Sequence, residues 1–217
     1  MSVVAGRLQV MNEVAHSGVR IPFTGRRTAQ VYEQMLLDHV STSSSMKQAV
    51  LYLGQHGGDP YQRFGRARTA TLRSDPLPAG GPVFTWYPDD RVLASAIARA
   101  RGTMLAILSS DRPDAAGWAA AVRAHNLLTG EATPGVDTES VELFGDLVEA
   151  GYRGGHDTRD GYIMSKARPA MTELLARGHN TDFIVTYCLA MGLTDKHARD
   201  LRTLHPGSTL RRSRGTV

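Results

Sequence analysis

Cysteine is almost absent from this chain of 217 residues. Cys188 is the only one, so the chain cannot form an internal disulfide, and a metal site built from several cysteines is excluded. Cys188 lies in the apolar stretch FIVTYCLAM, where we expect a buried structural thiol rather than a reactive one. Such sparse use of cysteine suits a reducing compartment, and the location that we predict is the cytoplasm.

Long apolar runs are lacking as well. Every run is far shorter than the ~20 residues that a membrane-spanning helix needs. The first residues do not combine a charged start with an apolar block, as a signal peptide does. Hydrophobic residues make up 41% of the chain and charged residues 21%, values that favour a globular fold over a disordered chain. We therefore expect no contact with a membrane.

Familiar catalytic and cofactor motifs are also missing. No glycine-rich phosphate loop follows a predicted strand, and the chain contains no GxSxG motif. No two of the eight histidines share a metal-ligand spacing on one helix, and the pair His156-Asp157 lies in a glycine-rich segment. The sequence therefore predicts neither a metal nor a cofactor, and it favours a binding protein over an enzyme.

What the chain does have is an uneven distribution of charge, although its net charge is only +4. Residues 1–110 carry 12 basic and 7 acidic side chains, residues 111–160 carry 4 basic and 10 acidic ones, and residues 161–217 are again basic. An acidic middle between basic flanks favours either contact with a polyanion or association of copies through opposite faces.

The clearest structural pattern is a strand–helix–strand unit over residues 82–108. Val83–Tyr87 is rich in β-branched and aromatic residues, the aspartate pair after it is able to cap a helix, and Thr103–Leu108 is a second apolar strand. The crossover of about 15 residues suits a parallel connection. Two strands do not make a stable sheet, so we expect Arg66–Leu72, and as a further option Arg7–Met11, to complete it.

Helices are predicted on both sides of this unit. Before it we expect Thr28–Val40 and Met46–Gln55. From Pro113 onward we expect helices alone, over Ala115–Leu128, Thr138–Ala150, Asp160–Arg177, Asp182–Met191 and Asp195–Leu204. The predicted fold class is therefore α+β and predominantly helical, with a small sheet that contains one parallel βαβ unit (82–108), followed by a C-terminal helical bundle.

The predicted domain organisation follows these elements. Residues 1–112 are expected to form N-terminal helices and a small α/β sheet, residues 113–205 a helical bundle, and residues 206–217 a basic disordered tail. The alternative is that the first two segments form one compact domain.

The last two predicted helices resemble a helix-turn-helix by spacing. Asp182–Met191 is followed by Gly192 and then by Thr194–Leu204, with Cys188 at the small position four residues before the glycine. A second helix in such a unit enters the major groove of DNA. The resemblance covers about 20 residues and would also fit a plain helical hairpin.

Basic side chains of this hairpin and of the tail are the candidate nucleic-acid contacts. They are Lys196, Arg199, Arg202, Arg211 and Arg212. Asp195 and Asp200 lie on the same helix and weigh against DNA contact, so the alternative is a hairpin that only packs against its neighbours.

A second basic segment is YQRFGRARTATLR at residues 61–73. It interleaves aromatic residues with arginines, and Arg66 and Arg68 are its candidate contacts with single-stranded nucleic acid. The alternative is an edge strand whose charges prevent aggregation.

The third candidate site is the carboxyl edge of the two βαβ strands, where open parallel sheets bind ligands. The residues that would gather there are Tyr87, Asp89, Asp90, Ser109, Ser110 and Asp111. Asp89 with Asp111 has the chemistry to hold a magnesium ion. The alternative is that Asp89 caps a helix and Asp111 is a turn residue.

Three classes of function stay open. The sequence favours a non-enzymatic binding or regulatory protein that contacts nucleic acid or another protein, through the C-terminal hairpin and the basic flanks. The first alternative is a small enzyme, or a nucleotide- or anion-binding protein, that uses the edge at Asp89 and Asp111. The second is an oligomeric structural or interaction module, in which an acidic helical face meets a basic face of another copy.

Overall fold

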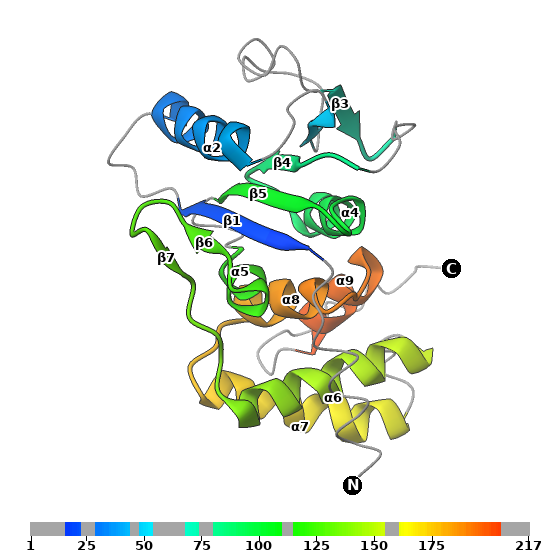
Figure 1. Cartoon of the computed structure of the whole chain (residues 1–217). Helices are drawn as coiled ribbons and strands as arrows, with labels where there is room; N and C mark the ends of the chain where they lie inside the picture. The colour runs from blue at the N-terminus through cyan, green and yellow to red at the C-terminus, as the bar shows by residue number, and fades with distance from the viewer. Residues whose placement is uncertain are drawn as a thin grey trace, which may run out of the picture.

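The fold is seen in a computed structural model, which describes residues 16–22, 29–43, 48–53, 68–73, 80–109, 115–154 and 161–204. Within these ranges lies a seven-stranded, mostly parallel sheet with the strand order β3-β2-β4-β5-β1-β6-β7 (Figure 1). The strands are β1 (Ser17–Pro22), β2 (Val50–Leu53), β3 (Arg68–Thr71), β4 (Val83–Trp86), β5 (Met104–Ser109), β6 (His125–Asn126) and β7 (Glu131–Ala132). Only β7 runs antiparallel to its neighbour.

The helices alternate with the strands and then continue alone to the C-terminal side. They are α2 (Ala29–Ser43), α4 (Asp90–Arg99), α5 (Ala116–Val122), α6 (Thr138–Gly154), α7 (Gly161–Ala176), α8 (Thr181–Ala190) and α9 (Asp195–Thr203). This is a mixed α/β protein with a Rossmann-like strand order and additional C-terminal helices.

The central strands β4 and β5 are buried along almost their whole length because both faces of the sheet are covered there. Residues 105–108 of β5 are all fully buried. They lie between Val83–Trp86 of β4 and Gly18–Ile21 of β1, both in parallel register. Continuous apolar strands of this kind are typical of buried parallel sheets.

Each face of the sheet has its own buried cluster. On one face, Val19, Ile21 and Phe84 pack with Tyr32 and Leu36 of α2. On the other, a larger cluster joins strand residues with side chains from α4, α5, α6, α7, α8 and α9. This larger cluster draws on residues before and after residue 112, the boundary predicted between two domains; the division itself stays a prediction.

The C-terminal helices are attached to the sheet through α5 and α8. A Cβ atom at Gly117 of α5 would lie 1.9 Å from the carbonyl oxygen of Phe183 in α8, so only glycine permits this close approach. Farther from the sheet, α6 and α7 lie side by side (Figure 1). Phe144 of α6 stacks on Tyr187 of α8 with ring centroids 3.9 Å apart.

Several sequence predictions are confirmed. The strand–helix–strand unit is present as β4–α4–β5 in parallel pairing, and Arg66–Leu72 contains β3. The helices predicted near residues 28–40, 138–150, 160–177, 182–191 and 195–204 are present as α2 and α6 to α9. No helix of the described ranges is long and apolar enough to cross a membrane.

The predicted fold class, α+β with a small sheet, is wrong. The sheet has seven strands. The predicted sheet is smaller because three of the segments that form strands are misassigned or missed in the sequence analysis. Ser17–Pro22 was not predicted as a strand, since it lies among glycines and a proline. Met46–Gln55 was predicted as a helix, whereas Val50–Leu53 is a strand held between β3 and β4.

The expectation of helices alone after Pro113 is also wrong. The helix predicted over Ala115–Leu128 ends at Val122, because Arg123 adopts a left-handed conformation with φ of 51°. His125–Asn126 then pairs with β1, and a short antiparallel partner follows. The strand considered at Arg7–Met11 and the tail 206–217 lie outside the described residues.

Candidate ligand site at the carboxyl edge of the sheet

The connections that follow β1 and β5 leave the sheet toward opposite faces. Helix α2 follows β1 and packs on one face, whereas α5 follows β5 and packs on the other. The two strands are parallel neighbours, with Pro22 opposite Ser109 at their carboxyl ends. Ligands of open α/β sheets bind at such switch points, because the diverging connections leave a crevice at the sheet edge.

An arginine side chain, that of Arg20, lies at this switch point. The Nε of Arg20, on β1, donates a hydrogen bond of 3.1 Å to the Oγ of Ser109 on β5. Ser109 is fully buried and Arg20 is half-buried. Because neighbouring residues of a strand face opposite sides, and Val19 and Ile21 face α2, the Arg20 side chain leaves the sheet on the side of α5.

Tyr87 ends β4 at the same edge and has strained backbone geometry. Its φ of 44° lies in the left-handed region, and a bulky residue there costs roughly 1–3 kcal/mol unless its surroundings enforce it. A hydrogen bond to the neighbouring strand holds this backbone in place: the N–H of Tyr87 donates to the carbonyl oxygen of Leu108 on β5 at 2.8 Å. Strain of this kind is often found at functional sites.

Glu33 of α2 is buried near the Tyr87 phenol. Its exposed fraction is 6%. The pKa of Tyr87 is raised, first by burial and then by the nearby Glu33 and Tyr32. The sequence analysis missed Glu33, although a signal was present: in a helix, Glu33 falls on the same side as Leu36 and Val40, which are core residues.

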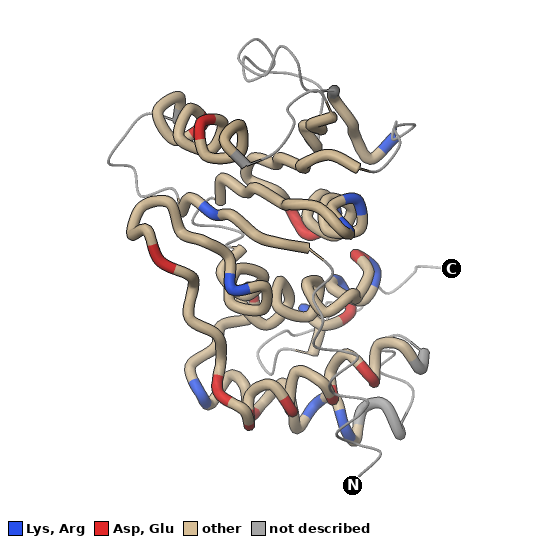
Figure 2. The backbone as a smooth tube through the Cα atoms, in the orientation of Figure 1, with Lys and Arg blue, Asp and Glu red and all other residues tan. Residues whose placement is uncertain are grey.

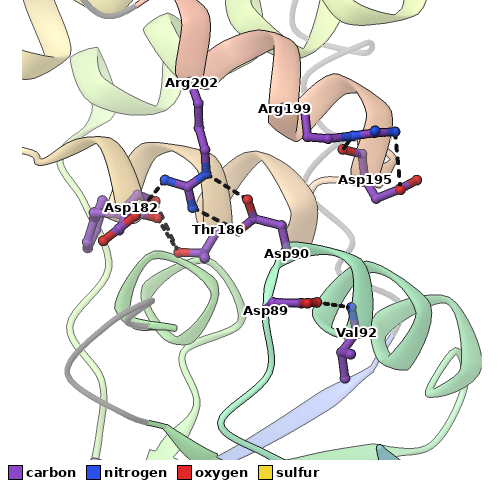
Figure 3. A network of polar contacts seen from close by, with 9 residues as sticks. Asp89, Asp90, Val92, Asp182, Thr186, Asp195, Arg199 and Arg202 are labelled. Atoms are coloured by element: carbon purple, nitrogen blue, oxygen red, sulfur yellow. Dashed lines mark hydrogen bonds and ion pairs between the residues drawn. The ribbon is translucent and has the colours of Figure 1, made fainter. Parts of the chain in front are cut away.

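Three aspartates, Asp89, Asp90 and Asp111, are predicted at this edge of the sheet. Asp89 is the N-cap of α4, and its Oδ1 accepts a hydrogen bond of 2.8 Å from the backbone N–H of Val92 (Figure 3). This confirms the cap interpretation of Asp89. Ser110 and Asp111 lie outside the described residues. In the part of the chain that is described, no group of three or more His, Cys, Asp or Glu side chains is placed to hold a metal ion.

Arg202, a predicted nucleic-acid contact, joins three helices (Figure 3). Its Nε and one terminal nitrogen donate to both carboxylate oxygens of Asp90 at 2.7 and 2.9 Å, and its other terminal nitrogen donates to Asp182 at 2.6 Å. Hydrogen bonding to Asp90 and Asp182 raises the pKa of the guanidinium above its ordinary value, despite partial burial. The side chain therefore ties α9 to the first residue of α4 and to α8.

The other predicted contacts of the hairpin lie on its surface. Lys196 is exposed, and Arg199, with a side chain 65% exposed, points away from the Arg202 contacts toward Asp195 (Figure 3). Gly192 makes the turn between α8 and α9 with φ of 102°. Arg211 and Arg212 lie outside the described residues.

Arg66 and Arg68 are the predicted contacts in the basic segment at residues 61–73. Arg68 is the first residue of β3, opposite Val50, and Arg66 lies outside the described residues. Cys188 is fully buried in α8, and burial raises the pKa of its thiol, as expected for an inert side chain.

The carboxyl edge of the sheet therefore carries two separate pairs of side chains, Arg20 with Ser109 on the side of α5 and Tyr87 with Glu33 beside α2. Of these four residues, only Ser109 and Tyr87 were predicted. A scan against protein-family models gives no match for this chain, and searches of curated proteins and of solved structures give none either.

Proposed function

We propose that the protein binds a small anionic ligand, carrying a phosphate or carboxylate group, at the carboxyl ends of β1 and β5. The observation that carries this proposal is the position of Arg20, whose guanidinium is fixed by Ser109 at the switch point of the sheet. Arginine recognises phosphate and carboxylate groups through paired N–H donors.

The surroundings support an ordered anion site. Ser109 is buried and holds the plane of the guanidinium, which lowers the entropy cost of using it for a ligand. Half-burial of Arg20 also reduces solvent screening, so its attraction for an anion is stronger than that of a fully exposed arginine. Tyr87 directly follows β4 at the same edge of the sheet, where its hydroxyl would donate a hydrogen bond to a larger ligand.

The test compares two arginine variants. We would measure binding of inorganic phosphate, pyrophosphate and AMP by calorimetry and by the shift of the melting temperature. A ligand at 100 times its Kd stabilises the folded state by about 2.7 kcal/mol. We expect Arg20→Gln to lose this stabilisation, and Arg168→Gln, an exposed position on α7, to keep it. Equal binding by both variants, or no binding of any of the three by the unmodified protein, would contradict the proposal.

A second candidate function is nucleic-acid binding through α9. The observation that favours it is that Lys196 and Arg199 are exposed and lie three residues apart, so they share one side of the helix. Electrophoretic mobility shifts at several salt concentrations test it. Affinity should fall steeply with salt, and replacing Lys196 and Arg199 by glutamine should reduce the log–log salt slope by about 1 for each lost phosphate contact. An affinity that does not change with salt concentration would exclude binding of nucleic-acid phosphates through α9.

A further inference from the structure

A groove of about 230 Å³ lies between α4 and the turn that joins α8 to α9. Its apolar lining is Ala94, Ile97, Ala98, Leu189 and Leu193. Its polar lining is Ser95, Arg101, Thr194 and Asp195. The groove is built by α4 and the α8–α9 turn and not by the carboxyl ends of β1 and β5, so it is a separate feature from the proposed ligand site.

The size of this groove suits side chains of a partner better than a free ligand. Pockets for cofactors and drug-sized ligands measure about 300–1,000 Å³ and bury most of the ligand. A smaller apolar hollow is the form that anchor residues fill at protein interfaces. The alanines and Ser95 on the outer side of α4 allow another helix to approach closely.

The rim of the groove is basic. Arg101 lines the groove and is exposed, and Arg91 and Arg199, with side chains 61% and 65% exposed, lie next to its lining residue Asp195. Asp195 is shared between Arg91 and Arg199 at 3.8 and 3.6 Å. Ion pairs this long and this exposed contribute little, so the rim keeps an excess of positive charge.

The matching acidic surface of the same chain is on α6 (Figure 2). Glu139, Glu142 and Asp146 follow one another at spacings of three and four, which places them along one side of the helix. Arg177 pairs with Asp137 and Glu139 at the start of this row. Glu142 and Asp146 continue it, with the half-buried Leu143 beside them.

We infer that the groove between α4 and the α8–α9 turn binds α6 of a second copy of this chain. The basic rim meets Glu142 and Asp146 of the second copy. Charge complementarity between the two surfaces selects this occupant. Because the two surfaces differ, the contact is heterologous and generates a ring or an open chain of copies. The inference is independent of the proposed ligand site.

The experiment measures the mass of the full chain in solution by light scattering and analytical ultracentrifugation. We expect association at concentrations up to about 100 μM, and weaker association when salt rises from about 50 mM to about 500 mM, because exposed charges are then screened. A monomer throughout this range at low salt overturns the inference.

Charge reversal identifies the two surfaces. Arg91→Glu/Arg199→Glu on the rim and Glu142→Arg/Asp146→Arg on α6 should each weaken association at least tenfold, and the chain with all four changes should regain it. Arg168→Glu, on the exposed side of α7, is the matched control and should leave association unchanged. Restored association in the fourfold variant also shows that the variants fold. If the rim variant loses association while the α6 variant keeps it, another partner surface occupies the groove and the inference is wrong.

Discussion

Two polar regions of this molecule are built in opposite ways. Around α5, α8 and α9, buried polar groups are matched inside the protein: Trp118 donates to His16, and Arg202 is held by two carboxylates. At the carboxyl edge of the sheet, Tyr87 has a strained backbone, and Arg20 donates a hydrogen bond to the buried hydroxyl of Ser109. The first region uses its polar groups for stability, whereas the second keeps the backbone of Tyr87 strained at a cost to stability, which is the arrangement expected of a site.

The largest effect is expected at His16. The Nε1–H of Trp118 donates a hydrogen bond of 3.0 Å to the Nε2 of His16, which can accept it only while the imidazole ring is neutral. Burial lowers the pKa of His16 from 6.5 to about 4. Because the unfolded chain binds a proton on this ring at higher pH than the folded chain, the contribution of His16 to stability is complete above pH 6.5 and is lost as pH falls toward 4, by up to about 3 kcal/mol.

Urea unfolding at several pH values between 4 and 7.5 measures this contribution. His16→Gln retains an acceptor for Trp118 but does not titrate, so its stability should fall less than that of the unmodified chain across this window. His197→Gln is the matched control, since glutamine suits the third position of a capped helix. If the unmodified chain and His16→Gln show parallel pH profiles, His16 is not held neutral in the fold.

The next effect concerns Arg202. Replacing it with glutamine leaves Asp90, whose side chain is 14% exposed, close to Asp182 without a counter-charge. Losing one partner of a buried ion pair costs 3–5 kcal/mol, but Arg202 and Asp182 are each about one-third exposed, so we expect a loss of about 2 kcal/mol in the free energy of unfolding.

Arg199→Gln is the comparison variant for Arg202 because both lie on α9. Arg199 is exposed and pairs only loosely with Asp195, so its replacement should change stability by less than about 0.5 kcal/mol. Equal costs for the two variants would show that the Arg202 contacts do not fasten α9 to α4.

The comparison of the two regions also explains what the sequence can predict. The β4–α4–β5 unit was found because its signals are local: a capping aspartate, an apolar stripe and a terminal glycine lie within one short stretch. The Met46–Gln55 assignment failed because four apolar residues fit a helix or a buried strand equally well, and pairing with β3 and β4 decides between them.

The polar contacts were harder to foresee than the elements. His16 and Trp118 lie 102 residues apart, and Arg202 and Asp90 lie 112 apart. No local pattern links such positions, and Arg202 therefore looked like a surface residue beside Lys196 and Arg199. Arg20 escaped notice for a related reason, since its role depends on a strand that was not predicted.

Replacing Thr85 is expected to stabilise the fold moderately. The experiment tests whether β4 carries a buried polar group without a hydrogen-bond partner near the site. Its Oγ is buried and has no hydrogen-bond partner in the described part of the chain. Thr85→Val removes the hydroxyl and keeps the shape, so we expect the free energy of unfolding to rise by about 1 kcal/mol. Thr103→Val, where the hydroxyl donates to the carbonyl oxygen of Ala100, should instead lower it. Urea unfolding of both variants decides, and a loss at Thr85 would mean that its hydroxyl is matched.

The smallest effect on stability, and the one that most directly separates the two regions, concerns Tyr87. Asparagine adopts the left-handed conformation more readily than a bulky residue does. Tyr87→Asn gives up only the contacts of a side chain that is 39% exposed, so we expect a change in the free energy of unfolding of no more than about 0.5 kcal/mol. The same variant should bind phosphate or pyrophosphate more weakly if the strained tyrosine is retained for the site. A large loss of stability would show instead that Tyr87 is held in place for packing, and the contrast between a matched region and a strained edge would then disappear.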